Sequence, residues 1–347
     1  MTVDSRSNLI GGIYEIGVGV TDLDRAVAFW SAWGYRPGPM GHLASTEAHK
    51  LYGVSSGLQS IRLHHQTAVH GLVRLFKWTE PTGPGLGFAP LRSTGSRWSV
   101  HKTDDIMSVF NHAETARQQG QAIRLRGPMI NVRSTARGYE QRPFEKSIRA
   151  SHNFEMLFPE ARVVAMQRFH IDITKYGTIA ADSVLRTSEG CHMGLVVTRE
   201  DFSLFDFYRD ALGFKFGKRV VIDCEPGYTP SDFFDLMPGE SFTECDLEDP
   251  ASGTTPETQL PGRLRVFMIH HSRPQPDLRP ISRPGHLGNC LYTCRVRDVG
   301  AARAAVAAYA KHGGASQITP IMANEFGEAG FSFTAPDGYA WAVVQAT

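Results

Sequence analysis

The chain has 347 residues, which is long for one hydrophobic core and suggests about two domains. Its 36 basic and 35 acidic residues are mixed along the chain and leave a formal net charge of +1, so the charge gives no reason to expect nucleic acid or an anionic membrane as a partner. No apolar run approaches the roughly 20 residues that cross a bilayer, residues 1–8 lack the apolar core of a signal peptide, and five scattered cysteines fit reduced thiols better than disulfides. We therefore expect a soluble, cytoplasmic protein.

One pattern recurs four times along the chain: a short apolar strand, a helix with one apolar face, a glycine, and further apolar strands. In the first copy Asp22 or Asp24 can cap the helix, because a short carboxylate accepts the free amide hydrogens of its first turn. Apolar residues then recur every three or four positions, and Gly34 ends the helix. The four copies open at Ile13, Trp98, Cys191 and Cys290. A nearly regular period of this kind indicates a repeated structural unit.

The repeat also predicts how the domains are built. A single unit leaves one sheet face bare, so two units must pair to bury it, and four units give two domains. The stretch 174–190 is polar, rich in small residues and lies between the second and third units. We therefore expect one domain over residues 1–175, with modules 1 and 2, and another over residues 190–347, with modules 3 and 4.

Two long stretches, 134–153 and 224–261, show no regular periodicity and are interpreted as loops. Loops of this length are more often lids or binding loops than spacers. Tyr228 and Phe242 lie in the second stretch and are candidates for covering a bound substrate. Exposed loop aromatics are the alternative interpretation.

Three segments carry a resemblance to a known superfamily. Residues 13–34 (IYEIGVGVTDLDRAVAFWSAWG) and 191–214 (CHMGLVVTREDFSLFDFYRDALGF) resemble the openings of modules in the vicinal-oxygen-chelate superfamily, the glyoxalase, bleomycin-resistance and extradiol-dioxygenase type. Residues 331–345 (FSFTAPDGYAWAVVQ) resemble the phrase that closes such modules. The resemblance implies an α+β fold of four βαβββ modules, paired into two glyoxalase/extradiol-dioxygenase-like domains. Four tandem modules are the layout of extradiol dioxygenases.

Members of this superfamily hold a divalent metal through His, Gln or Glu on the first strand of a module and Glu on the last strand. Carried over to this chain, the positions fall at Glu15, Trp98, His192 and Leu291 on first strands and at Arg74, about Ala165, Arg265 and Ala342 on last strands. Only Glu15 and His192 could ligate, and they belong to different predicted domains. An arginine offers no lone pair and repels a cation. We therefore expect no metal and no other cofactor, with Fe(II) or Mn(II) required only if the chain is a dioxygenase.

Arginine at two corresponding positions suggests a different use of the same site. If Arg74 and Arg265 point into the curved sheets, each could bind a carboxylate or enolate through two hydrogen bonds; solvent-facing arginines are the alternative. His192 is the candidate acid/base because imidazole titrates near neutral pH, and a structural histidine is the alternative. Glu15 could line the pocket, although an internal ion pair with Arg74 is favoured. His271 shares strand parity with Arg265 and could extend its pocket.

Three functions are consistent with these residues. The first is an enzyme of aromatic-compound catabolism that acts on a small, oxygenated, aromatic and anionic substrate by metal-independent acid/base chemistry. It would be a lyase, decarboxylase or isomerase, with His192 moving a proton and Arg265 stabilising negative charge. The second is a metal-dependent extradiol ring-cleaving dioxygenase, favoured by module layout alone. The third is a non-catalytic small-molecule binding or resistance protein. A homodimer is left open, since no feature marks an interface.

Overall fold

The structure is a computed structural model that describes residues 8–134, 149–169, 171, 173, 175–198, 202–224, 232–270, 273–311 and 313–346, with only the backbone described for residues 130–134 and 149. Each sequence repeat folds into a βαβββ module. Module 1 comprises β1 (Leu9–Gly19), α1 (Leu23–Ala32), β2 (Tyr35–Leu43), α2 (Ser45–Tyr52), β3 (Leu58–His65) and β4 (Leu72–Trp78). Module 2 comprises β5 (Arg97–Thr103), α3 (Ile106–Gln118), β6 (Arg124–Ser134), β7 (Arg149–Leu157) and β8 (Arg162–Phe169).

The second half of the chain repeats this order. Module 3 comprises β9 (Thr187–Val197), α4 (Ser203–Asp210), β10 (Lys215–Asp223), β11 (Ser241–Glu248) and β12 (Arg263–His270). Module 4 follows the short 3₁₀ helix η3 (Arg279–Ile281) and comprises β13 (Gly288–Val296), α6 (Val299–Ala310), β14 (Met322–Ala323), β15 (Ala329–Thr334) and β16 (Ala340–Gln345). The predicted α+β class and its four modules are confirmed. Among the described residues, no helix combines the length and the apolar character needed to cross a membrane.

The local signals in the first repeat act as expected. The Asp22 side chain accepts a hydrogen bond from the backbone nitrogen of Arg25 and so caps α1. Gly34 follows the helix with φ of +88°, a left-handed conformation that glycine adopts without steric cost. The five cysteines are free thiols, as predicted, and Cys290 and Cys294 are buried.

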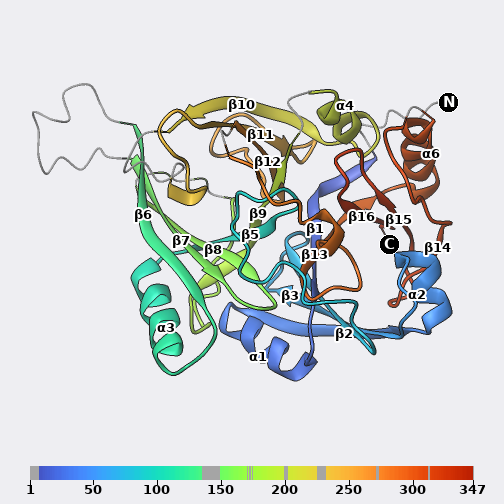
Figure 1. Cartoon of the computed structure of the whole chain (residues 1–347), viewed down its shortest axis with the longest axis horizontal. Coiled ribbons are helices and arrows are strands. Elements are labelled where there is room, and N and C mark those ends of the chain that lie inside the picture. The colour runs from blue at the N-terminus through green and yellow to red at the C-terminus, as the bar shows by residue number, and fades with distance from the viewer. Residues whose placement is uncertain are drawn as a thin grey trace, which may run out of the picture.

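The modules pair in an order that differs from the sequence-based expectation. One eight-stranded sheet has the order β14-β15-β16-β13-β1-β4-β3-β2 and joins modules 1 and 4; the other has the order β10-β11-β12-β9-β5-β8-β7-β6 and joins modules 2 and 3. We call them sheet 1/4 and sheet 2/3. In Figure 1, sheet 2/3 runs from β10 at the top to β6 at the left.

The expected pairing of module 1 with 2 and of module 3 with 4 is therefore wrong. β1 pairs antiparallel with β13, with Glu15 opposite Thr293. β5 pairs in the same way with β9, where Val100 lies opposite His192. Pairing of modules 1 with 2 and 3 with 4 would cover the exposed edge of each first strand as well as the observed pairing does. Periodicity along the chain therefore could not distinguish the two arrangements. The proposed boundary at 175–190 also falls partly inside β9, which begins at Thr187.

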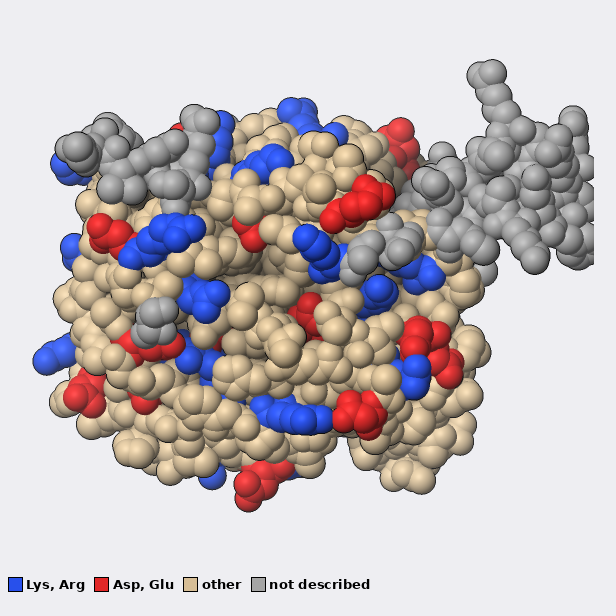
Figure 2. All heavy atoms as spheres, turned by 180° about the vertical axis from the view of Figure 1, so that it is seen from behind, with Lys and Arg blue, Asp and Glu red and all other residues tan. Residues whose placement is uncertain are grey.

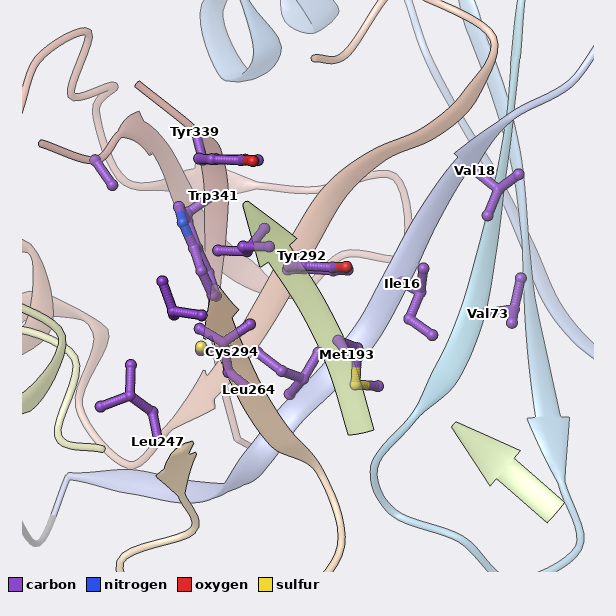
Figure 3. Packing of buried hydrophobic residues seen from close by; sticks show 14 of the residues in the cluster. Ile16, Val18, Val73, Met193, Leu247, Leu264, Tyr292, Cys294, Tyr339 and Trp341 are labelled. Atoms are coloured by element: carbon purple, nitrogen blue, oxygen red, sulfur yellow. The ribbon is translucent and has the colours of Figure 1, made fainter. Parts of the chain in front are cut away.

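The two sheets pack back to back around one large core. Figure 3 shows Ile16 and Val18 of β1 facing Met193 of β9 and Leu264 of β12 across this core. Each sheet thus keeps one face for the shared core, and its concave face carries a separate cluster. Figure 2 shows acidic and basic side chains interspersed on one side of the molecule, in keeping with the small net charge. The concave faces are where a ligand site is to be sought.

Tyrosine hydroxyls tie the sheets together. The Tyr292 hydroxyl of β13 lies 2.9 Å from the carbonyl oxygens of both Trp98 and Gly194 and accepts a hydrogen bond from the Trp98 nitrogen at 3.2 Å. The Tyr339 hydroxyl donates to the carbonyl oxygen of Val196 at 2.6 Å. These contacts fall where β5 meets β9, so sheet 1/4 supports the centre of sheet 2/3.

The module pairing predicts how the chain behaves when cut. We expect residues 1–178 and 179–347, expressed separately, to show no cooperative urea unfolding as monomers, because each fragment holds half of both sheets. Mixing the two fragments should restore the cooperative transition of the intact chain, measured by circular dichroism. Independent cooperative unfolding of each monomeric half would contradict the pairing.

A buried histidine in the shared core predicts acid sensitivity. His101 packs between Trp30 and Trp33, and burial lowers its pKa to about 4. The unfolded chain, with an ordinary histidine pKa near 6.5, takes up a proton between pH 6.5 and 4 that the folded chain refuses, so stability falls as the pH drops through this window. Replacing His101→Gln should reduce the loss of unfolding free energy between pH 7 and 5 by about 2 kcal/mol.

The measurement is urea unfolding at the two pH values. The control is His112→Gln, since His112 is exposed on α3 and this variant should keep the wild-type pH dependence. An unchanged pH dependence in His101→Gln would show that His101 takes up its proton in the folded protein.

Candidate functional site

The concave face of sheet 2/3 contains a charged pocket of about 600 Å³. Its basic lining comes from β8, β10 and β12, and its acidic lining from β11. The charged residues that line it are Arg168, Lys215, Lys218, Asp246, Glu248, Arg263 and Arg265. The lining also includes the apolar side chains of Ile171, Ile173 and Phe216. The pocket therefore combines an excess of positive charge with apolar surface.

Two of the arginines already have carboxylate partners. Arg263 contacts Asp246 at 3.1 Å and Glu248 at 2.6 Å. Arg265 donates from Nε to Asp246 at 2.9 Å and lies 3.7 Å from Glu244. Burial alone would lower the pKa of Arg265, but Asp246 and Glu244 raise it above its ordinary value. Arg265 thus points into the concave face, as its strand parity predicted, and the carboxylates nearest to it belong to the chain itself.

Arg168 differs from these two arginines. Among the described residues it forms no ion pair with a carboxylate, and its buried Nη1 atom has no hydrogen-bond partner. Its guanidinium lies over the ring of Tyr176, 4.5 Å from the centroid. Burial lowers the pKa of Arg168, and the charges of Arg265 and Arg263 act in the same direction. A guanidinium in this position is the group that an anionic ligand would stabilise.

Tyr176 and His192 form a buried pair behind the residues that line the pocket. The Tyr176 hydroxyl lies 2.9 Å from Nδ1 of His192, within hydrogen-bonding distance. His192 is 5% exposed, Tyr176 is fully buried, and neither belongs to the lining of the pocket. Burial raises the pKa of Tyr176 to about 12, although Arg263 opposes this shift. The structure therefore brings His192 next to Arg263, its register partner in β12, but one layer behind the pocket.

Sequence reasoning missed both Arg168 and Tyr176. Arg168 lies on β8 at the parity of Val164 and Met166, the residues that face the concave side, so strand alternation could have found it. The prediction placed the site residue of this strand at about Ala165. Ala165 faces the shared core, and its neighbours Val164 and Met166 face the concave side. Tyr176 lies in the linker between β8 and β9 and carries no sequence signal.

Aromatic side chains fill the other end of the same concave face. The ring centroids of Trp98 and Phe267 lie 5.5 Å apart, and those of Phe234 and Phe242 lie 5.2 Å apart. Gly194 allows this packing, because a Cβ there would lie 2.1 Å from the Trp98 ring. Phe242 was expected in a substrate-covering loop, but it belongs to β11 and is 1% exposed. The prediction was wrong because β11 is a short strand inside the stretch 224–261, whose flanking residues show no regular periodicity.

Two of the remaining candidates belong to sheet 1/4. The predicted internal ion pair is present, with Nη1 of Arg74 3.3 Å from Glu15. Both side chains are fully buried, so neither reaches a solvent-open pocket in this structure. His271 and Tyr228, the last two candidates, lie outside the described residues.

The residues present do not fit the divalent metal that the superfamily resemblance implies. Glu15 is held by Arg62 and Arg74, and His192 has Val100 and Arg263 as its neighbours across the sheet. Within the described ranges, no group of three His, Cys, Asp or Glu side chains could hold a metal ion. Apolar and cationic groups thus stand where donor atoms would be needed.

Comparison with known proteins agrees on the fold. No family model matches the sequence, and no curated protein matches it. A mutant of glyoxalase I from Zea mays has a TM-score of 0.57 at 16% identity, covering 99% of this chain and 94% of its own. Glyoxalase I from Zea mays itself gives 0.54 at 16% identity, with 97% and 92% covered. A putative dioxygenase from Bacillus subtilis gives 0.52 at 10% identity, with 98% and 86% covered.

These matches define the class of protein by its fold. The chain shares its fold with these glyoxalase I and dioxygenase structures, and this is the α+β fold that the sequence resemblance predicted. The similarity to glyoxalase I from Zea mays extends over nearly the whole chain. At these identities the likeness extends to the fold alone, so activity has to be argued from the site.

The residues at the expected metal-ligand positions predict the metal content of the purified protein. Protein purified without chelator should contain iron, manganese, nickel and zinc well below one equivalent per chain, because the ligand positions hold cationic and apolar groups. EDTA should leave the thermal unfolding midpoint unchanged. Stoichiometric iron or manganese by elemental analysis, lost in His192→Ala, would contradict this prediction.

Proposed function

We propose that the protein is a metal-independent enzyme that acts on a small, aromatic, anionic substrate bound in the pocket of sheet 2/3. The observation that carries this proposal is the Arg168 guanidinium, which lines the pocket and forms no ion pair with a carboxylate among the described residues. Ile171, Ile173 and Phe216 offer apolar surface for a ring. An aromatic carboxylate or enolate would satisfy both features at once.

The charged residues would have separate roles in this chemistry. Arg168 holds the anionic group of the substrate, because it alone among the pocket's arginines lacks a carboxylate within the described part of the chain. Arg263 and Arg265 keep the pocket positive while paired, and so favour negative charge that develops during a reaction. His192 lies behind the pocket lining and contacts the Tyr176 hydroxyl, so we assign it a positioning role and a role as proton acceptor for that hydroxyl. Lyase, decarboxylase and isomerase reactions each need this combination of an acid/base and an anion hole.

The position of His192 also favours a second function. Since the pocket lining includes neither His192 nor Tyr176, the protein could bind and sequester an aromatic acid without changing it. Incubation with the bound compound followed by product analysis separates these two functions. The dioxygenase hypothesis depends on metal, and the elemental analysis proposed above decides it.

Arg168 gives the proposal a direct binding test. Benzoate and phenylpyruvate should raise the thermal unfolding midpoint of the wild-type protein, and Arg168→Met should abolish this stabilisation, because the group that the anion neutralises is gone. Without ligand, Arg168→Met should be at least as stable as wild type, since it removes a largely buried charge that lacks a described partner. Differential scanning fluorimetry measures both effects.

A matched control is Arg117→Met, which removes an arginine paired with Glu114 on the surface of α3. It should keep the full stabilisation by both acids. Equal stabilisation of wild type and Arg168→Met would show that the acids bind elsewhere and would remove the basis of the proposal.

A further inference from the structure

Two buried arginines lie side by side on the concave face of sheet 1/4. Arg62 of β3 and Arg74 of β4 are direct register partners in the antiparallel pair. Arg62 is 5% exposed and Arg74 is fully buried. Both contact Glu15 of β1, which supplies one negative charge for two positive ones. Strand pairing alone therefore leaves the site with an excess of positive charge.

The turn between β14 and β15 supplies the missing charge. Glu328 accepts from both terminal nitrogens of Arg62, at 2.9 and 2.7 Å. Glu325 accepts from Nε of Arg74 at 2.8 Å and contacts its Nη2 at 2.5 Å. Both ion pairs are bidentate, the geometry that guanidinium and carboxylate prefer. Burial would raise the pKa of Glu325, but Arg74 lowers it below its ordinary value.

An aromatic ring completes the contact. Phe326, between the two glutamates, lies with its centroid 4.4 Å from the guanidinium carbon of Arg62 and 5.1 Å from that of Arg74. The turn therefore presents one ring and two carboxylates to two arginines, a pattern that a small aromatic dicarboxylate could reproduce.

The turn is a compact unit that side chains hold to the sheet, since Glu325 also accepts hydrogen bonds from Tyr52 at 3.0 Å and Ser60 at 2.7 Å. The Asn324 side-chain oxygen accepts from the backbone nitrogens of Phe326 and Glu328 at 2.9 and 3.0 Å, and Gly327 has φ of +79°. The strand before it, β14, has two residues and stands at the edge of the sheet. Few backbone hydrogen bonds therefore oppose its withdrawal, while its own shape is held internally.

A neighbouring pocket shares Tyr52 with this cluster, and neither Arg62 nor Arg74 belongs to its lining. It has a volume of about 500 Å³, and the Tyr52 hydroxyl lies 2.6 Å from Nη2 of Arg74. Its charged lining residues are Lys50 and Arg283, and no aspartate or glutamate lines it. An anion in this pocket would meet positive charge beside Tyr52, the side chain that contacts Arg74.

We propose that Arg62 and Arg74 form a second ligand site, specific for a small aromatic dicarboxylate, which residues 324–328 of the chain itself occupy in this structure. The turn acts as a tethered competitor, so an external acid binds only when Glu325 and Glu328 withdraw. This site lies on the opposite sheet from the pocket that contains Arg168 and does not depend on the function proposed for that pocket.

Removal of the two competing carboxylates tests the proposal. Glu325→Ala/Glu328→Ala keeps Asn324 and Gly327, which hold the turn, and leaves Arg62 and Arg74 with Glu15 alone. We expect this double variant to bind phenylsuccinate at least about tenfold more tightly than the wild type does, by isothermal titration calorimetry. Adding Arg62→Met should abolish the gain. All proteins in the comparison carry Arg168→Met, so that binding in sheet 2/3 does not contribute.

Two further proteins keep the test decisive. If the double variant does not fold, Glu328→Gln replaces the more exposed of the two glutamates, at 18% side-chain exposure, and should bind phenylsuccinate more tightly than wild type. Glu114→Ala, which breaks a surface ion pair with Arg117, is the control and should show no gain. A folded double or single variant that binds no more tightly than wild type would overturn the proposal and leave the arginines a purely structural role.

Discussion

The back-to-back packing of two composite sheets constrains every other feature of this protein. Each sheet takes two modules from opposite halves of the chain and buries one face in the common core. That core uses the helix-side residues of all four modules, among them Ile16, Met193 and Tyr292 (Figure 3). The concave faces carry the buried charged clusters of the described residues. Because apolar burial drives the packing, the location of the sites follows from the core and not from the site residues.

Both concave faces carry buried arginines, and burial of a guanidinium sets strict conditions. A buried charge is tolerated when it is paired and hydrogen-bonded. Arg74 meets this condition through Glu15 and Glu325, and Arg265 through Asp246. Arg168 does not meet it among the described residues. The same physical requirement distinguishes the fully paired Arg74 from Arg168, on which the proposed anion site rests.

The similarity to glyoxalase I from Zea mays and to a putative dioxygenase from Bacillus subtilis concerns architecture. A fold of this kind hosts different chemistries, since function depends on the groups at the site. His192 keeps a side chain that could ligate, but Val100 and Arg263 are its neighbours. A hydrogen bond to Tyr176 is the interaction that the structure gives it instead.

The sequence by itself determined the features that depend on neighbours along the chain. A capped first helix, the glycine at position 34 and the four modules follow from local hydrogen bonding and periodicity. Strand alternation placed Arg74 and Arg265 on equivalent faces but left open whether those faces point inward or to solvent. The tertiary structure decided which modules pair, which carboxylates reach the arginines, and that the Arg168 guanidinium lies over the ring of Tyr176. Glu325 lies 251 positions from Arg74 in the chain, and no periodic pattern encodes a contact between residues so far apart. Such contacts arise only when packing of the whole core fixes how the sheets are assembled.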